Sequence, residues 1–375
     1  MFIKKLELQN FRNYKNFSID INSHKVLVIG KNAKGKTNLL EAVLYLSCLD
    51  SYRITKDLEL IKWEEDFAKI KADILKDNFL TTMAVNICPP KKKELFLNGI
   101  KKTKNSDFLG NLKVISFSVN DLMLLRGAPE DRRKWIDMAI SQLYPAYSDR
   151  LSKYNKIKLQ KNNFLKEVKK TGNFDPNLMD VFNSQLVTSG SNIIYLRIKF
   201  LKEIEESAIQ THKQIADNEN LKFSYLSKTN PETNYLKEEI SVENIAKDFE
   251  NMLEKRKQEE IVRAQTLVGP HRDDITFFIN DKDASKFASQ GQQRTVVLAL
   301  KLAELNLLKS KSNYNPVLLL DDVLAELDDV RQAYLLNSIP EKTQTIITSV
   351  DTLLFEQEFL KDVTIYRVED GNIKL

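Results

Sequence analysis

The chain has 375 residues, 57 of them Lys or Arg and 52 Asp or Glu, so its formal net charge is only +5. Its 42% apolar content is enough for a buried core, which argues against disorder, and its length favours two or three domains. No segment predicts a membrane span or a secretory signal, so we expect a cytoplasmic protein. The two cysteines and three histidines show no familiar ligand spacing, which argues against zinc or thiol chemistry.

The first part of the chain predicts strands with short connections and one helix. Residues 4–9 alternate in polarity, residues 24–29 form an apolar run as long as a buried strand, and residues 38–49 carry a broad apolar face typical of a helix. Asn98–Gly99 lies between two alternating segments, which is the usual chemistry of a two-residue hairpin turn. These elements predict a layer of β-sheet.

The segment between the predicted strand and helix matches the phosphate-binding sequence G-x-x-x-x-G-K-[ST] without a mismatch. Its glycines let the loop wrap so that successive backbone N–H groups point at phosphate oxygens, next to a helix N-terminus. The lysine offers a positive charge to the β- and γ-phosphates, and the threonine hydroxyl is a ligand for Mg²⁺. We predict that ATP contacts Gly30, Lys31, Asn32, Ala33, Lys34, Gly35, Lys36 and Thr37, with Lys36 also catalytic and Thr37 also on the metal.

Residues 130–265 change character and predict mainly helix. One helical stripe starts after Pro129 and runs past residue 150 with a kink at Pro145, and two further helical patterns cover about 178–216 and 242–265. We therefore expect a helical lobe at 130–265 and an ATPase lobe made of 1–129 and 266–375. Heptads are not sustained, and an arm of about 40 helical residues reaches only roughly 60 Å, so no long coiled coil is expected.

The last part of the chain returns to alternating strands and helices. The expected elements are helices at 292–309 and 328–338 and strands at 317–320, 345–348 and 363–368. The apolar strand at 317–320 delivers Asp321 to the Mg²⁺ of a P-loop site. Asp322 is the candidate catalytic residue that orients or activates water, and because aspartate is one methylene shorter than glutamate, we expect slow hydrolysis.

A third element, Ser289-Gln290-Gly291-Gln292-Gln293-Arg294, opens the helix at 292–309. A hydroxyl and a glycine at a helix N-terminus can bind an anion, but the same residues also make an ordinary helix cap. The residues alone leave both interpretations open.

Five features follow one another along the chain: the P-loop, the helical insertion, S-x-G-Q-x-R, the Asp pair and Ala325-Glu326-Leu327-Asp328. In this order they resemble ATP-binding-cassette (ABC) ATPases of the chromosome-maintenance type. Residues 125–137 are similar to the G-x-P-x-x-R-R motif of the RecF family of bacterial recombination mediators. Four further segments are similar to other parts of proteins of that family, in the same order along the chain: LELQNFRNY, LFLNG, GPHRDD and LLLDDVLAELDDVRQAYL. The resemblance implies an α/β fold: a P-loop ABC-ATPase head, with mixed sheet layers around the P-loop helix and a mainly helical second lobe.

The family resemblance also implies roles for individual residues. Ser289, Gly291 and Gln292 would contact ATP held by a second subunit, and Asp328 would lie at the dimer seam. Arg12 and Asn13 would be N-terminal nucleotide contacts. The sequence departs from the pattern in lacking the transporter signature L-S-G-G-Q, in having Asp322 where a glutamate is expected, and in having no switch histidine near Thr348-Ser349, where either residue takes that position.

By the same resemblance, ATP and Mg²⁺ are the expected cofactors. The expected function is ATP-dependent DNA binding in replication, recombinational repair and the SOS response, with weak DNA-stimulated ATPase activity. An ATP-dependent homodimer would clamp double-stranded DNA or single/double-strand junctions and, with RecR, RecO-type mediators and the RecA recombinase, promote recombinase loading. The alternatives are the ATPase subunit of a membrane transporter, which the departures disfavour, and another SMC-like chromosome-maintenance ATPase.

Direct support for DNA binding is modest. Residues 150–172 carry eight basic side chains against one acidic, with Tyr154 and Phe164 between them. A solvated lysine-rich face explains such clusters equally simply, and no base-reading motif is present, so any binding should be led by phosphate contacts and sensitive to salt. A second basic cluster surrounds the predicted hairpin: Lys91, Lys92, Lys93, Lys101, Lys102 and Lys104.

Overall fold

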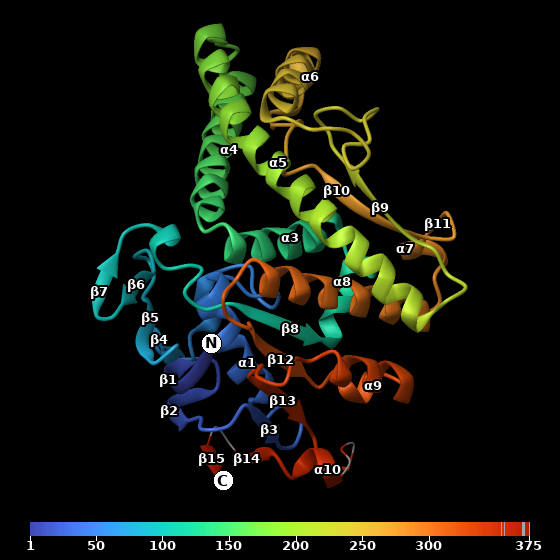
Figure 1. Cartoon of the computed structure of the whole chain (residues 1–375). Helices are drawn as coiled ribbons and strands as arrows, with labels where there is room; N and C mark the ends of the chain where they lie inside the picture. Colours follow the sequence, from blue (N-terminus) through green and yellow to red (C-terminus); the bar gives the residue numbers. More distant parts are fainter. Residues whose placement is uncertain (354, 356, 370–371, 375) are drawn as a thin grey trace.

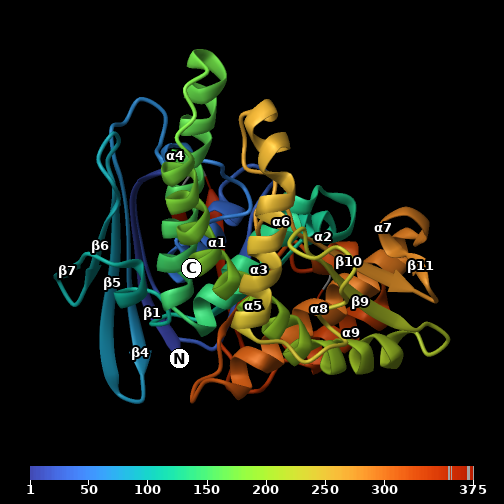
Figure 2. The same cartoon turned by 90° about the horizontal axis from the view of Figure 1, so that it is seen from above.

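The computed structural model describes residues 1–353, 355, 357–369 and 372–374 (Figure 1). Its first sheet is antiparallel in the order β2-β1-β4-β5-β6-β7, and Figure 2 shows it as a layer along one side of the molecule. The strands are β1 (Phe2–Phe11), β2 (Tyr14–Asp20), β4 (Ala68–Lys76), β5 (Phe79–Ile87), β6 (Glu94–Leu97) and β7 (Ile100–Lys102). Asn98 and Gly99 have φ of 52° and 77°, as the predicted hairpin turn requires.

The second sheet carries the candidate site, and its order is β15-β14-β3-β13-β12-β8. The strands are β15 (Asn372–Lys374), β14 (Val363–Glu369), β3 (Lys25–Ile29), β13 (Thr345–Ser349), β12 (Val317–Asp321) and β8 (Val114–Ser118). The five strands from β14 to β8 are parallel, so their carboxyl ends meet at one edge. The ends of β3 and β12, with the glycine-rich loop and the Asp pair, therefore lie on the same side of the sheet.

Helices cover both faces of this parallel sheet. The helix α1 (Lys36–Cys48) lies between the two large sheets, in a core that includes Val317 and Leu319 of β12. The neighbouring residues Leu318 and Leu320 face the opposite core, which contains apolar residues of α8 (Gln290–Ser310). This alternation is that of a strand buried on both faces.

The helical part of the chain contains α3 (Pro129–Leu143), α4 (Ala146–Thr171), α5 (Pro176–Ile215) and α6 (Val242–Arg263). The single kinked stripe expected around Pro145 is instead two helices, because α3 ends at Leu143 and α4 starts after the proline. Pro145 lacks an N–H and so cannot continue the hydrogen-bond ladder of α3.

Strand β9 (Leu221–Leu226) lies within the stretch expected to be mainly helical. It pairs with β10 (Asp274–Ile279), which also pairs with β11 (Lys282–Asp283), in a third sheet. One core contains residues from both sides of the expected boundaries at 129/130 and 265/266, including Trp135, Ile194 and Leu300. Those lobe boundaries stay a prediction.

Short elements complete the described chain. They are η1 (Asp57–Leu60), η2 (Asn105–Asp107), η3 (Val119–Leu122), α2 (Met123–Arg126), α7 (Ala284–Phe287), η4 (Leu324–Glu326), α9 (Asp329–Asn337) and α10 (Gln357–Leu360). Among the residues described, no helix combines the length and apolar character needed to cross a membrane.

Candidate functional site

The glycine-rich loop connects β3 to α1, and two of its positions accept only glycine. A Cβ on Gly30 would lie 2.7 Å from the carbonyl oxygen of Val368. Gly35 has φ of 110°, and a Cβ there would lie 2.5 Å from Asn13 Nδ2. The loop is therefore packed closely on both flanks and must have glycine at these two positions.

Lys36 begins α1 and points its ammonium group into the loop. Its Nζ donates to the carbonyl of Gly30 at 2.7 Å and lies 4.0 Å from Asp322 Oδ2, and the residue is only 4% exposed. The loop thus holds one buried positive charge beside its backbone and the N-terminus of α1. This geometry fits the phosphates of a nucleotide.

Asp321 ends β12 and reaches the start of α1. Its Oδ1 accepts hydrogen bonds from Thr37 Oγ1 at 2.9 Å and Thr348 Oγ1 at 3.0 Å. Burial raises the pKa of this carboxyl above its usual range, and the bond from Thr37 opposes that shift. Two strand ends and the first turn of α1 therefore meet at one carboxylate.

Asp322 has the strained backbone of a functional position. Its φ is 51°, uncommon for a residue other than glycine, and its backbone N–H donates to Thr348 Oγ1 at 2.9 Å. Among the described atoms, Asp322 Oδ1 is buried without a hydrogen-bond partner. Together with Thr37 and Asp321 it forms a set of oxygen ligands that suits Mg²⁺. Thr348 is the one of the two switch candidates that contacts both aspartates, whereas Ser349 accepts the N–H of Gly30 through its carbonyl at 3.2 Å.

The two N-terminal candidates, Arg12 and Asn13, flank the loop in different ways. Asn13 Nδ2 donates to the carbonyl of Lys34 at 3.2 Å. Arg12 instead makes a two-point contact with Glu41, through Nε at 2.9 Å and Nη2 at 2.8 Å. The guanidinium of Arg12 is therefore held by a carboxylate, whereas Asn13 touches the loop directly.

The network around Glu41 was missed from the sequence. Glu41 is 4% exposed on α1 and also accepts hydrogen bonds from Arg53 Nη1 at 2.8 Å and Ser51 Oγ at 2.6 Å. The signal that could have found it is a single charge within the apolar stretch 39–46 of a helix expected to be buried, because a buried charge requires partners.

The signature residues are not part of the site built by the loop and Asp pair. Exposed Ser289 caps α8 by accepting the N–H of Gln292 at 3.2 Å. The side chain of Gln292 accepts from the N–H of Ser289 at 2.8 Å and donates to Glu219 at 2.8 Å. Gly291 lies near Arg331, which pairs with exposed Asp328 at the start of α9. These contacts lie within the signature region and α9, apart from that to Glu219 in the connection between α5 and β9.

Comparison with known proteins decides the family. The family model described as RecF/RecN/SMC N terminal domain matches residues 2–374. The DNA replication and repair protein RecF of Bacillus thuringiensis (strain Al Hakam) is 39% identical over 100% of this chain and 98% of its own length, as is that of Bacillus cereus (strain B4264). The chain belongs to the RecF family.

Solved structures of RecF proteins agree with this assignment. The recombination mediator protein RecF with ATP, from the RecFOR pathway, is 32% identical with a TM-score of 0.90 over 100% of this chain and 97% of that one. A Smc head from Pyrococcus furiosus has a TM-score of 0.52 at 15% identity over 100% of this chain and 95% of that one, which shows the shared fold alone. The expected RecF family and ABC-ATPase head fold are confirmed, and the transporter alternative is set aside.

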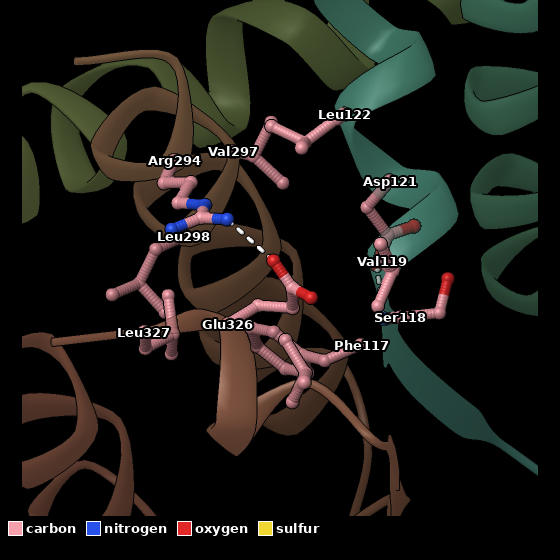
Figure 3. A pocket seen from close by; sticks show the side chains of 11 residues that line it. Phe117, Ser118, Val119, Asp121, Leu122, Arg294, Val297, Leu298, Glu326 and Leu327 are labelled. Carbon is pink, nitrogen blue, oxygen red and sulfur yellow. Dashed lines mark hydrogen bonds and ion pairs between the residues drawn. The ribbon is translucent and has the colours of Figure 1, made fainter. Parts of the chain in front are cut away.

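In this RecF-family chain, a small apolar pocket joins the signature helix to the segment after the Asp pair. Figure 3 shows Arg294 of α8 paired with Glu326 of η4, opposite the segment 118–122. The two side chains approach to 2.5 Å. Asp121 on the opposite wall is buried, and burial raises its pKa to about 6. The pocket therefore lies between the signature helix and the carboxyl edge of the parallel sheet, and both contribute to its lining.

In both basic clusters, some of the basic side chains are paired with carboxylates and are not free to contact DNA. In α4, Lys161 is fully buried and paired with Glu260 at 2.6 Å, and Tyr154 is buried. Near the hairpin, Lys93 pairs with Asp57 and Lys101 with Glu94. The basic residues of α4 that stay exposed are Arg150, Lys153, Lys156, Lys166, Lys169 and Lys170.

Proposed function

We propose that this chain is an ATP-dependent DNA-binding protein of DNA replication and recombinational repair, with a place in the SOS response. One observation supports the proposal most strongly. The glycine-rich loop and both aspartates contact one another within one chain, whereas Ser289 lies apart from them, exposed at the N-terminus of another helix. A second copy can bring its signature helix to the first copy's nucleotide. ATP binding then closes a homodimer on DNA.

Within one subunit, the loop from Gly30 to Thr37 holds the phosphates of ATP. Lys36 places its charge at the β- and γ-phosphates, and Thr37 and Asp321 hold Mg²⁺, which supplies further positive charge there. The hydrogen bond that Thr37 Oγ1 donates to Asp321 Oδ1 already holds these two oxygens 2.9 Å apart. We assign the same loop, with Asn13 and Arg12 on its flank, as the nucleotide-binding residues.

Hydrolysis depends on Asp322, which orients or activates water. Its short side chain reaches less far than glutamate, and its left-handed backbone is held by Thr348. We therefore expect a weak, DNA-stimulated ATPase whose hydrolysis releases the clamp. From the partner subunit, Ser289, Gly291 and Gln292 offer a hydroxyl and helix N–H groups to the γ-phosphate, and Asp328 lies at the seam.

Exposed basic residues of α4 support contact with the DNA backbone, which makes binding salt-dependent. The proposed targets are double-stranded DNA and single/double-strand junctions in the cytoplasm. RecR and RecO-type mediators and the RecA recombinase are the proposed partners, because solved RecF structures in the comparison are described as belonging to the RecFOR pathway.

Sedimentation velocity with ATP, Mg²⁺ and duplex DNA tests this function in the full chain. We expect the wild-type chain to form an ATP-dependent dimer on DNA, and both Lys36→Met and Ser289→Arg to stay monomeric. Lys36→Met should fail to bind ATP, whereas Ser289→Arg should bind it normally. Identical monomers in all three cases would contradict the clamp.

A further inference from the structure

A polar cavity of about 720 Å³ lies away from the nucleotide site, and we call it the α3/α4 cavity. Its walls are the segment 50–55 after α1, the first half of α3, the stretch 151–158 of α4, Arg197 of α5 and residues 270–272. None of its lining residues belongs to the glycine-rich loop, the Asp pair or the signature segment. Its volume lies in the range of small-molecule sites.

Most of the acidic groups lining this cavity are already engaged. Asp50 pairs with Lys134 at 3.2 Å, and Asp137 pairs with Arg197 at 2.9 Å. Asp131 accepts the N–H of Ala128 at 2.8 Å at the start of α3, and Glu130 is exposed. Three cations of the lining, Arg133, Lys158 and Arg272, are left for other partners.

These three cations have no carboxylate partner within the described ranges. Arg133 Nη1 donates to the carbonyl of Asp273 at 2.8 Å, and Arg272 Nη2 donates to Gln265 Oε1 at 3.1 Å. Lys158 is half-buried, and across the same ranges it has neither a hydrogen bond nor an ion pair. Burial lowers the pKa of Lys158, Arg133 and Arg272 lower it further, and the carboxylate of Glu130 opposes that shift, with the lowering effects dominant. Like charges held together in this way favour an anion between them.

His271 lies among the same cations but adds no charge. Its Nδ1 lies 2.6 Å from the hydroxyl of Tyr154, and its Nε2 lies 3.1 Å from the carbonyl of Thr266. Because a carbonyl only accepts, Nε2 carries the hydrogen, and Tyr154 donates to Nδ1 of the neutral ring. Burial lowers the pKa of His271 to about 3, and Lys158, Arg272 and Arg133 contribute to that shift.

We propose that the α3/α4 cavity binds a phosphate group between Arg133, Lys158 and Arg272. Phosphate is favoured over a single carboxylate because it brings up to two negative charges and several acceptor oxygens to three separate donors. The guanidinium groups of the two arginines also bind phosphate in two-point contacts. The cavity is larger than one phosphate, so the group belongs to a larger molecule, either a nucleotide or a nucleic-acid strand. The inference goes beyond the proposed function, because the site needs neither ATP nor a second subunit.

The test uses the imidazole resonances of His271 in the full chain, followed by NMR during titration with inorganic phosphate at constant ionic strength. A His271→Asn variant assigns the signals among the three histidines. We expect a saturable shift in the wild-type chain and a roughly tenfold weaker response in Lys158→Met, the loss expected for one charge-assisted contact. The control is Lys247→Met, an exposed lysine of α6 outside the cavity, which should respond as the wild type does.

Two further arms separate the sources of the phosphate and the two phosphate sites. A 5′-phosphorylated oligonucleotide that shifts His271 more than its 5′-hydroxyl twin indicates a terminal phosphate, and equal shifts indicate a backbone diester. A shift with a nucleoside 5′-monophosphate but with neither oligonucleotide indicates a nucleotide, and a response to inorganic phosphate alone contradicts a larger ligand. Lys36→Met should keep the response. The proposal is overturned if Lys158→Met responds as the wild type does, if Lys36→Met abolishes the shift, or if only an oligoglutamate peptide produces it.

Discussion

The loop region and the signature region are both helix N-termini, but they are completed in opposite ways. The loop region draws ligands from distant parts of its own chain, with Asp321 and Thr348 meeting Thr37. The signature region satisfies itself locally, through the cap between Ser289 and Gln292, and leaves its hydroxyl exposed. Under the proposed function, this difference would let the loop region hold a nucleotide and the signature region contact a nucleotide held by another subunit.

A mixture of two inactive chains tests most directly whether the two regions act across subunits. Lys36→Met removes the loop charge, and Ser289→Arg blocks the signature. We expect neither variant to dimerise alone, but an equimolar mixture to form a heterodimer with one intact composite site, joining Lys36 of one chain to Ser289 of the other. Sedimentation with ATP and Mg²⁺ measures the effect, which is all or none.

A control separates this trans contact from simple instability. Each variant should keep the wild-type circular dichroism spectrum and unfolding midpoint. If the mixture stays monomeric while both variants are folded, the signature region does not act on a partner's nucleotide.

Asp321→Asn should have the next largest effect. The amide oxygen can still accept the bonds from Thr37 and Thr348, but the charge for Mg²⁺ is lost. We expect the gain in ATP affinity on adding Mg²⁺ to fall by roughly 10- to 100-fold, the loss of one charge-assisted contact or slightly more, measured by calorimetry.

The pH dependence of Mg²⁺ binding is a second test of the role of Asp321. Burial raises the pKa of Asp321, and the metal requires the deprotonated form. In the wild-type chain, Mg²⁺-dependent ATP affinity should therefore rise as pH increases through that raised pKa. An unchanged slope in Asp321→Asn would place the titrating group elsewhere.

Asp121→Asn probes the pocket between the two regions. Burial raises the pKa of Asp121 to about 6, from its ordinary value of 3.8. The folded state therefore favours the protonated acid, and the stability from this group is present below about pH 4 and lost as pH rises to about 6. In the wild-type chain the free energy of unfolding should fall by at most about 3 kcal/mol over this pH range, and in Asp121→Asn this fall should be absent. Urea unfolding curves measured across the same pH range test the difference.

The smallest effect is expected for the ion pair that lines the same pocket. Arg294 and Glu326 side chains are 30% and 44% exposed, so solvent screens them. We expect Arg294→Gln to change the free energy of unfolding by less than about 1 kcal/mol. A double-mutant cycle with Glu326→Gln measures the coupling, and a value well above that would mean that the pair locks the two regions together.

The sequence predicts best where a local pattern determines the structure. The apolar run 24–29 became β3, the helix expected at 38–49 became α1, and strand 317–320 became β12 with its Asp pair at the carboxyl edge. The glycine-rich loop could also be predicted, because all its residues, from Gly30 to Thr37, lie in one short segment and the motif alone places Lys36 beside them.

Contacts between distant segments were beyond local patterns. Nothing near Glu41 in the sequence indicates that Arg12 and Arg53 converge on it, because the three come from different elements. Strand β9 was missed because its partner β10 lies beyond the whole of α6. Pro145 showed where the helix would be disturbed, but the choice between a kink and a break depends on how α4 packs.

The position of β3 in its sheet has a consequence for how the protein is made. Its two neighbours in the sheet are β13 and β14, from residues 345–369, although β3 itself ends at Ile29. During translation this strand waits, unpaired in the parallel sheet, until almost the whole chain has left the ribosome. Messages truncated before β13 would therefore yield chains that carry the complete loop sequence but lack both strands that pair with β3.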